Sequence, residues 1–268
     1  MINCNKRIHL VLFVLLGLIA RINLQAQQSG KLDLAKYFTS HAGCFAVYDM
    51  KNHEYRRYNA ERCNKRFLPA STFKIPNTIV GLETGVIPDE NFVIKWDSVT
   101  RPIKEWNRDN TLSSAIQYSV VPYYKELARR VGRQKMQAYL KKIRYGNMKI
   151  GDRIDTFWLD NSLKISADEQ IEFLKKFYEE KLPCSKRSIE IVKRILPEEQ
   201  YPHSKLKFKT GTGTGENKAY IGWLVGYVEH GTGVYLFAMN VEAASYDEVK
   251  KLRDEIPRNV LKSLNILE

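Results

Sequence analysis

The sequence has few cysteines and few histidines, which limits the chemistry that it can support. Its 268 residues include four cysteines and five histidines. The histidines at positions 9, 41, 53, 203 and 230 are dispersed and show none of the spacings that hold a metal ion. We therefore expect no metal site.

The sequence has only one long hydrophobic run, and it lies at the N-terminus. A positively charged start precedes the apolar residues 8–20, and a small-residue exit follows at Gln25-Ala26-Gln27. This layout predicts a secretory signal peptide over residues 1–26 and an exported, periplasmic domain over residues 27–268. An N-terminal anchor helix is the alternative, but the run is shorter than the ~20 residues that span a bilayer. We expect no stable membrane anchor.

Too few cysteines remain after the leader for a disulfide framework. Loss of Cys4 leaves Cys44, Cys63 and Cys184, and an odd number leaves at least one thiol unpaired. Cys44 and Cys63 flank a predicted hairpin and could pair, or both could be buried small side chains. The sequence leaves both possibilities open.

Long basic runs are also missing, although the formal net charge is +13. Loss of residues 1–26 lowers it to +10, because three cations and no acid are removed. The cations are scattered at helix-surface spacing, as in Lys141-Lys142 and Lys175-Lys176. This pattern is typical of a solvated basic surface and not of a nucleic-acid site. Such a surface attracts small anions.

Strand patterns occur at both ends of the chain. Residues 43–50 and 54–59 alternate apolar and polar side chains around a turn, which predicts a hairpin. Late strand patterns follow, in this order: residues 206–210, 219–228 and 234–241.

Helix patterns fill the middle of the chain. An apolar stripe runs through residues 124–143, and Ser166 with Glu169 forms a capping box before another stripe. A last helix is expected over residues 246–264, kinked at Pro257. The fold class is α/β (α+β), with a mixed, mainly antiparallel sheet built from both chain ends and flanked by helices. A helical region is inserted between its early and late strands.

A serine and a lysine stand three residues apart in Ser71-Thr72-Phe73-Lys74, which opens an apolar helical stretch. Positions three apart share a helix face, so the Ser71 hydroxyl and the Lys74 amine point into the same space. A desolvated lysine can take the serine proton, and free backbone N–H groups at a helix start can stabilise an oxyanion. The alternative is a capping serine followed by a solvated lysine.

A second motif, Lys209-Thr210-Gly211, stands at the end of a predicted strand. On its own it could be a strand end with a glycine turn. Functionally, Lys209 offers a cation, Thr210 offers a hydroxyl, and Gly211 lets a substrate approach the backbone. S-x-x-K followed later by K-T-G marks penicillin-binding proteins and serine β-lactamases.

The chain resembles the class D β-lactamases, or oxacillinases, from about residue 43 to residue 264. The resemblance is carried by these motifs in the order of the family: Pro69–Asn77, Lys95-Trp-Asp97, Ser119-Val-Val121, Tyr145-Gly-Asn147, Phe157-Trp-Leu159 and Lys209-Thr-Gly211. Two departures concern substrate selectivity. Tyr118 stands where a smaller residue is frequent, and residues 212–218 form a short glycine-rich segment.

The resemblance implies a role for each catalytic position. Ser71 would be the nucleophile, and Lys74 would be carboxylated by CO2 and act as the general base; no other cofactor is implied. Ser119 would relay a proton to the leaving nitrogen. Lys209 joins this catalytic set, and Tyr145 and Asn147 look structural.

The resemblance also implies the groups that bind the substrate and the carbamate. Lys209, Thr210 and Arg253 would bind the carboxylate of a small β-lactam, and the backbone N–H groups of Ser71 and Thr212 would form the oxyanion hole. The Trp158 indole would hold the carbamate. An apolar wall would surround it, formed by Phe73, Val121 and Leu159.

Two other functions share the S-x-x-K motif. A β-lactam sensor domain holds the acyl-enzyme without hydrolysing it, and a penicillin-binding carboxypeptidase acts on cell-wall peptides. The oligomeric state and the range of β-lactams accepted are not encoded in any motif that we identify.

Overall fold

The computed structural model describes residues 33–268. The predicted signal peptide and its cleavage point therefore lie outside the described residues. The chain divides into units of residues 1–36 and 37–268, and the second unit contains the sheet and the helices that flank it. None of the helices in the described part is long and apolar enough to cross a membrane.

A six-stranded sheet organises this unit, in the order β2-β1-β8-β7-β6-β5. Its strands are β1 (Gly43–Asp49), β2 (Glu54–Tyr58), β5 (Glu198–Gln200), β6 (Ser204–Thr214), β7 (Tyr220–His230) and β8 (Gly233–Ala243). The early hairpin pairs with the last strand, which confirms a sheet built from both chain ends. Every neighbouring pair of these strands is antiparallel, so this sheet is not mixed.

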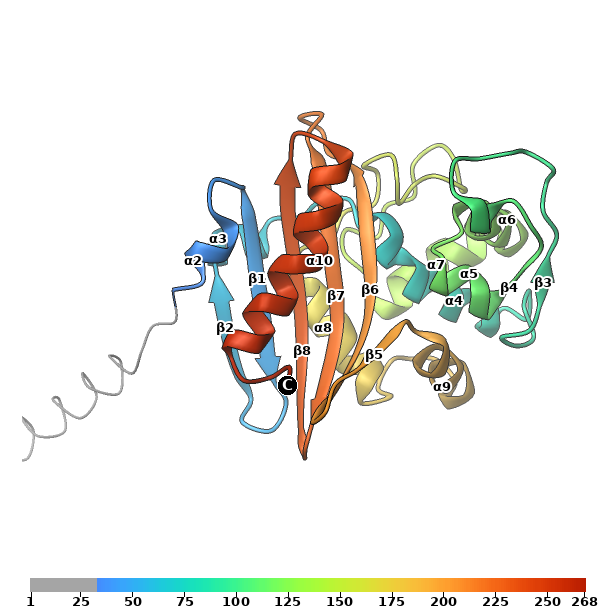
Figure 1. The fold of residues 1–268 in the computed structure, drawn as a ribbon. Helices are drawn as coiled ribbons and strands as arrows, with labels where there is room; N and C mark the ends of the chain where they lie inside the picture. The colour runs from blue at the N-terminus through green and yellow to red at the C-terminus, as the bar shows by residue number, and fades with distance from the viewer. Residues whose placement is uncertain (1–32) are drawn as a thin grey trace, which may run out of the picture. The chain divides into compact units, whose positions relative to one another are not determined.

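Helices cover both faces of the sheet (Figure 1). Helix α10 (Tyr246–Ser263) lies across one face against β7 and β8, and α8 (Ala167–Tyr178) lies on the other face against β8 and β1. The inserted region lies beyond the β5–β6 side of the sheet. Helix α2 (Ala35–Phe38) precedes the sheet. Besides α8, the elements between β2 and β5 are α3 (Ala60–Asn64), η1 (Ala70–Phe73), α4 (Lys74–Glu83), β3 (Val93–Ile94), η2 (Lys104–Trp106), β4 (Asn110–Thr111), α5 (Leu112–Gln117), α6 (Val121–Val131), α7 (Arg133–Ile143) and α9 (Lys186–Ile195).

Two helix predictions are corrected by the structure. The stripe over residues 124–143 belongs to two helices, α6 and α7, because Gly132 between them has φ +79°, outside the helical region. Ser71 lies in the 3-10 turn η1, and the α-helix begins only at Lys74. The capping box at Ser166 is confirmed. Pro257 lies inside α10, and its kink stays a prediction.

Cys44, Cys63 and Cys184 are free thiols in the structure. Cys44 and Cys63 are buried, and the neighbouring Cys44 thiol, with burial, raises the pKa of Cys63. The sequence left open a disulfide between Cys44 and Cys63 or two buried thiols, and the structure has the two buried thiols.

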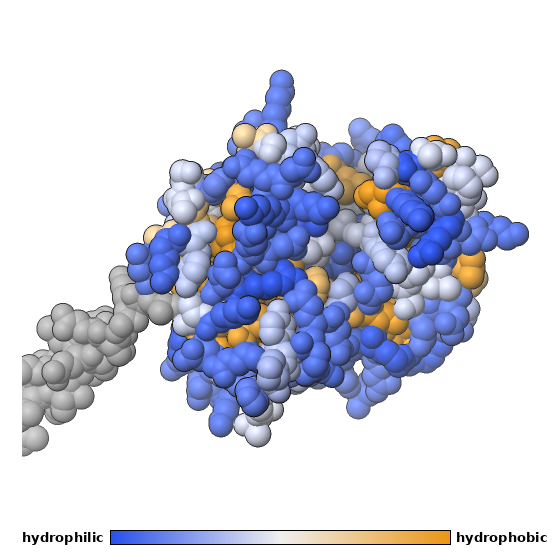
Figure 2. Space-filling view, viewed as in Figure 1, coloured by the Kyte–Doolittle hydropathy of each residue, from blue (hydrophilic) through white to orange (hydrophobic). Residues whose placement is uncertain are grey.

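The surface is mostly hydrophilic on the face seen in Figure 2, where hydrophobic residues show only in separate patches. This distribution fits the scattered charges of the sequence.

Candidate active site

The turn η1 places Ser71 beside the first residue of α4. Lys74 Nζ and Ser71 Oγ are hydrogen-bonded at 2.7 Å. The Lys74 side chain is only 1% exposed, so the alternative of a solvated lysine is wrong. Ser71, which is partly exposed, and the buried Lys74 therefore form a direct pair.

The surroundings of Lys74 favour the neutral amine. Burial first, and the nearby charge of Lys209 second, hold the pKa of Lys74 well below its ordinary value. Its Nζ lies 5.2 Å from the centre of the Tyr124 ring, and Tyr124 is held by a 2.8 Å hydrogen bond to Thr78. A neutral amine beside Ser71 can accept a proton.

The backbone at Ser71 is held in a strained turn. Ala70 has φ +48°, a conformation that is costly for a residue with a Cβ. Its N–H donates to the Trp158 carbonyl at 3.1 Å, and the Trp223 indole donates to the Leu68 carbonyl at 2.9 Å. These contacts fix the turn that carries the nucleophile.

Strand β6 runs directly beside this turn. A Cβ on Gly211 would stand 3.0 Å from the Pro69 carbonyl oxygen and 3.4 Å from the Ser71 nitrogen, so glycine permits the close approach. Phe208 donates its N–H to the Pro197 carbonyl, on the side of β6 away from β7. Because backbone N–H directions alternate along a strand, the Thr212 N–H points off the same side. The Ser71 backbone therefore lies beside the end of β6 that carries Thr212, and the predicted oxyanion hole stays a prediction.

Two cations lie along β6. Lys209 is 1% exposed, and burial together with the charge of Arg253 lowers its pKa to about 7. Arg253 reaches across from α10, where its Nη1 donates to Thr212 Oγ1. Its Nε is buried and has no hydrogen-bond partner among the described atoms. Thr210 and Thr212 share a strand face because they are two residues apart.

Trp158 packs against η1 with an unused donor. Its ring stacks on Phe73, with centroids 5.4 Å apart, and it is fully buried. Its Nε1 has no hydrogen-bond partner within the described part of the chain. A buried N–H without a partner is rare and costly, so this donor fits an additional acceptor close to Ser71.

Ser119 and Val121 lie at the junction between α5 and α6. Ser119 follows α5 with φ +54°, a strained conformation, and Val121 is the first residue of α6. Tyr124, one turn into α6, carries the ring next to Lys74. Within residues 33–268, the Ser119 hydroxyl makes no hydrogen bond to Ser71 or Lys74.

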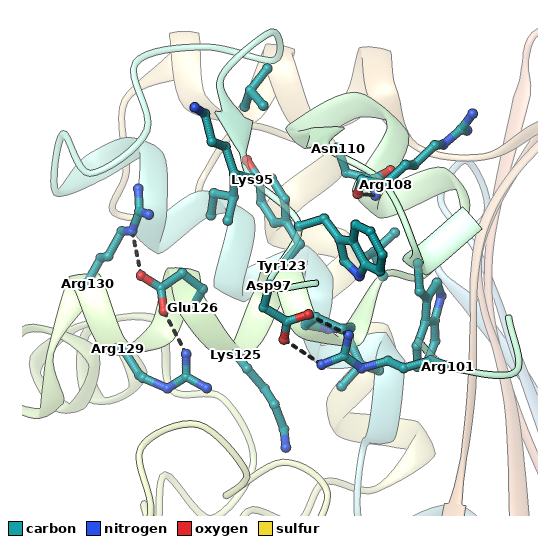
Figure 3. A pocket seen from close by; sticks show the side chains of 17 residues that line it. Lys95, Asp97, Arg101, Arg108, Asn110, Tyr123, Lys125, Glu126, Arg129 and Arg130 are labelled. Atoms are coloured by element: carbon teal, nitrogen blue, oxygen red, sulfur yellow. Dashed lines mark hydrogen bonds and ion pairs between the residues drawn. The ribbon is translucent and has the colours of Figure 1, made fainter. Parts of the chain in front are cut away.

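Val121 also lines a cleft of about 650 Å³ between α6 and the segment that joins β3 to β4 (Figure 3). Its two acids are already paired, Asp97 with Arg101, and Glu126 with Arg129 and Arg130. Other cations in this cleft, such as Lys125, point in different directions (Figure 3). The cleft contains neither Ser71 nor Lys74.

The remaining motif residues have structural contacts. Tyr145 is fully buried, and Asn147 accepts the N–H of Lys164 and donates to the Ser162 carbonyl. Tyr118 is 47% exposed, with the Arg108 guanidinium over its ring. The segment after K-T-G begins as strand, because β6 extends to Thr214, and residues 215–219 then form the turn to β7.

Three contributions were missed at the sequence level: the Tyr124 ring beside Lys74, the Thr212 hydroxyl on Arg253, and the bond between Gln170 and Thr72 at 3.0 Å. No group of three or more His, Cys, Asp or Glu that could hold a metal occurs in the described part of the chain.

Comparison with known proteins identifies the family to which this fold and its serine–lysine pair belong. Residues 43–262 match the family model "Penicillin binding protein transpeptidase domain". Beta-lactamase OXA-19 of Pseudomonas aeruginosa is 44% identical over 238 residues, 87% of this chain and 88% of the relative. The structure of a class D β-lactamase from Sebaldella termitidis matches with a TM-score of 0.85 and 38% identity, over 89% of this chain and 98% of that chain. The chain belongs to the class D β-lactamases.

A regulatory relative is also similar. Regulatory protein BlaR1 of Bacillus licheniformis is 36% identical over 203 residues, which cover 76% of this chain and 34% of that protein. Similarity of sequence therefore extends to a protein that is not named as an enzyme.

Proposed function

We propose that this protein hydrolyses β-lactam antibiotics through an acyl-enzyme on Ser71, with the Lys74 side chain as the general base. The observation that carries the proposal is the 2.7 Å contact between Ser71 Oγ and a buried Lys74 Nζ whose pKa is lowered. A base within hydrogen-bond reach is what turns a serine hydroxyl into a nucleophile.

The reaction follows from the neighbours of Ser71. Its Oγ attacks the β-lactam carbonyl while its proton passes to the Lys74 side chain, and the backbone N–H groups of Ser71 and Thr212 stabilise the oxyanion. The ring C–N bond breaks, and Ser119 passes a proton to the leaving nitrogen. A water molecule, deprotonated by the same base, then hydrolyses the ester and frees Ser71.

The residues around Lys74 fit a carbamate formed from CO2. A neutral amine is required for that reaction, and the unpartnered Trp158 N–H is a donor ready for a carbamate oxygen. Val121 and Leu159 would complete the apolar wall with Phe73. The carbamate would supply a basic oxygen beside Ser71.

Replacing Arg253 with alanine is expected to raise KM for penicillins. A charge-assisted hydrogen bond contributes about 1.5–3 kcal/mol, which corresponds to roughly a 10- to 150-fold change. Lys251→Ala, on an exposed position of the same helix, removes one charge and serves as the control. Steady-state kinetics measure both variants, and an unchanged KM in Arg253→Ala would place the carboxylate site elsewhere.

The pH dependence should report the charge of Lys209. Its pKa is about 7, so the cation is present below that pH and lost above it. Attraction for the substrate carboxylate should therefore weaken, and KM should rise, as pH increases through about 7. Lys209→Arg stays charged, so its KM should not rise as pH increases through about 7. If KM still rises through pH 7 in Lys209→Arg, the rise does not come from the titration of Lys209.

A turnover count separates the three functions that share this site. The proposed hydrolase converts a chromogenic cephalosporin many times per active site. A sensor domain stops after one equivalent because the acyl-enzyme persists, and a cell-wall carboxypeptidase releases D-alanine from a peptide ending in D-alanyl-D-alanine. A count of one, or turnover of the peptide alone, would contradict the proposal.

Export from the cytoplasm to the periplasm, where such a hydrolase would confer resistance, is part of the proposal. It rests on the sequence of residues 1–26 alone.

A further inference from the structure

A buried chain of hydrogen bonds supports the nucleophile turn from helix α8. The Gln170 Nε2 donates to Thr72 Oγ1 at 3.0 Å, and Thr72 Oγ1 donates to the Pro69 carbonyl at 2.7 Å. Tyr145 Oη donates to Gln170 Oε1 at 3.4 Å. Gln170 and Thr72 are each 1% exposed. Burying an amide or a hydroxyl costs free energy unless it is hydrogen-bonded, so this set of hydrogen bonds has one favoured arrangement.

Thr72 also contacts strand β6. A Cβ on Gly211 would stand 3.2 Å from Thr72 Cγ2, so the threonine methyl lies directly against the K-T-G strand. Ser71 precedes Thr72 on one side of this contact, and Thr212 follows Gly211 on the other. The Thr72 methyl and the Pro69 carbonyl, to which the Thr72 hydroxyl donates, are therefore two of the contacts that space the turn from Gly211 of β6.

We propose that Gln170, acting through Thr72, is a positioning residue that sets the geometry of the oxyanion hole and thus the rate of acylation. The inference rests on the proposed acyl-enzyme function. Gln170 touches neither Ser71 nor Lys74 through any hydrogen bond in the described residues, so its effect is indirect. Ala70 has a strained φ of +48°, so the backbone of the turn is expected to relax to a less strained conformation when this support is removed.

The geometry predicts an effect on the chemical step and not on substrate binding. Lys209 and Arg253, the proposed carboxylate-binding groups, lie on β6 and α10, and neither is hydrogen-bonded to Thr72 or Gln170 in the described residues. Oxyanion donors act on charge that develops in the transition state, and a misplacement of about 1 Å can cost on the order of 100-fold in rate.

The test compares matched variants in single-turnover experiments with a penicillin, which give the acylation rate constant and the non-covalent dissociation constant separately. Thr72→Val removes the hydroxyl and keeps the branched shape, and Gln170→Met removes the amide and keeps the length. Both should slow acylation on the order of 10- to 100-fold, with the dissociation constant changed less than about twofold. Thr72→Ser keeps the hydroxyl and should remain much closer to wild type.

Two controls distinguish positioning from general stability. Gln137 lies on α7, away from the turn, and its side chain donates a hydrogen bond to the Met148 carbonyl. Gln137→Met removes this bond and should lower Tm without slowing acylation. Tyr145→Phe removes only the long 3.4 Å bond and should have a smaller effect than Gln170→Met. The double variant Thr72→Val/Gln170→Met should be no slower than the slower single variant, because both act through one bond.

The outcomes are distinct for the inference and for the function on which it rests. A wild-type protein that is never acylated contradicts the proposed function itself. A wild type that is acylated, with Thr72→Val and Gln170→Met acylated at the same rate, overturns the inference alone. Slowing that follows Tm across all variants, Gln137→Met included, also overturns it.

Discussion

Replacing Ser71 with alanine is expected to abolish turnover of β-lactams while leaving non-covalent binding. In the proposed mechanism the hydroxyl oxygen forms the ester, whereas the proposed substrate-binding groups, Lys209, Arg253 and the backbone donors, remain. Loss of a nucleophile costs on the order of 10⁶ in kcat in serine hydrolases. The measurement is initial rate with a chromogenic cephalosporin, together with equilibrium binding of a penicillin.

The control is Ser263→Ala near the end of α10, where the hydroxyl bonds only to the Val260 carbonyl. This variant should keep full activity. A substrate adduct found by mass spectrometry on the Ser71→Ala protein would refute the assignment of the nucleophile.

Removing dissolved CO2 is expected to inactivate the enzyme, and bicarbonate should restore it. A general base contributes on the order of 10²- to 10⁴-fold, so degassed protein should lose at least about 100-fold in kcat. The loss should deepen as pH falls, because protonation of the Lys74 amine prevents its reaction with CO2. Activity measured in degassed buffer with and without added bicarbonate gives the result.

Trp158→Phe isolates the indole donor. It keeps an aromatic ring against Phe73 and removes the unpartnered N–H, so more bicarbonate should be needed and acyl-enzyme should accumulate as a burst before slow turnover. Trp223→Phe makes the same change where the N–H is already bonded to the Leu68 carbonyl. It should lower stability and some activity, because that bond helps to hold the nucleophile turn, but it should leave the bicarbonate requirement unchanged. Full activity without bicarbonate in degassed wild type and in Trp158→Phe would contradict the carbamate. The general base would then be the unmodified Lys74 amine.

The parts of the site that lie within one turn could be predicted from the sequence. Ser71 and Lys74 are three residues apart, and local helical geometry alone brings them together. The hairpin of β1 and β2 and the capping box of α8 are equally local, since each depends on a few neighbouring residues.

Contacts between distant segments could not be predicted in the same way. The Tyr124 ring reaches Lys74 only because α6 packs on α4, and no periodicity encodes which face of α6 does so. The Thr212 hydroxyl meets Arg253 because α10 packs on the start of β7, which pairs with the end of β6. The break at Gly132 was hidden because the apolar stripe continues on both sides of it.

A single-turnover experiment followed by intact-protein mass spectrometry tests the central claim most directly. Wild-type protein is mixed with a slight excess of penicillin and quenched at successive times. The account predicts one adduct of the mass of the intact penicillin, located on the Ser71 peptide, that rises and then disappears as hydrolysed penicillin is released. An adduct that persists, an adduct on another residue, or product formed without any adduct would contradict it.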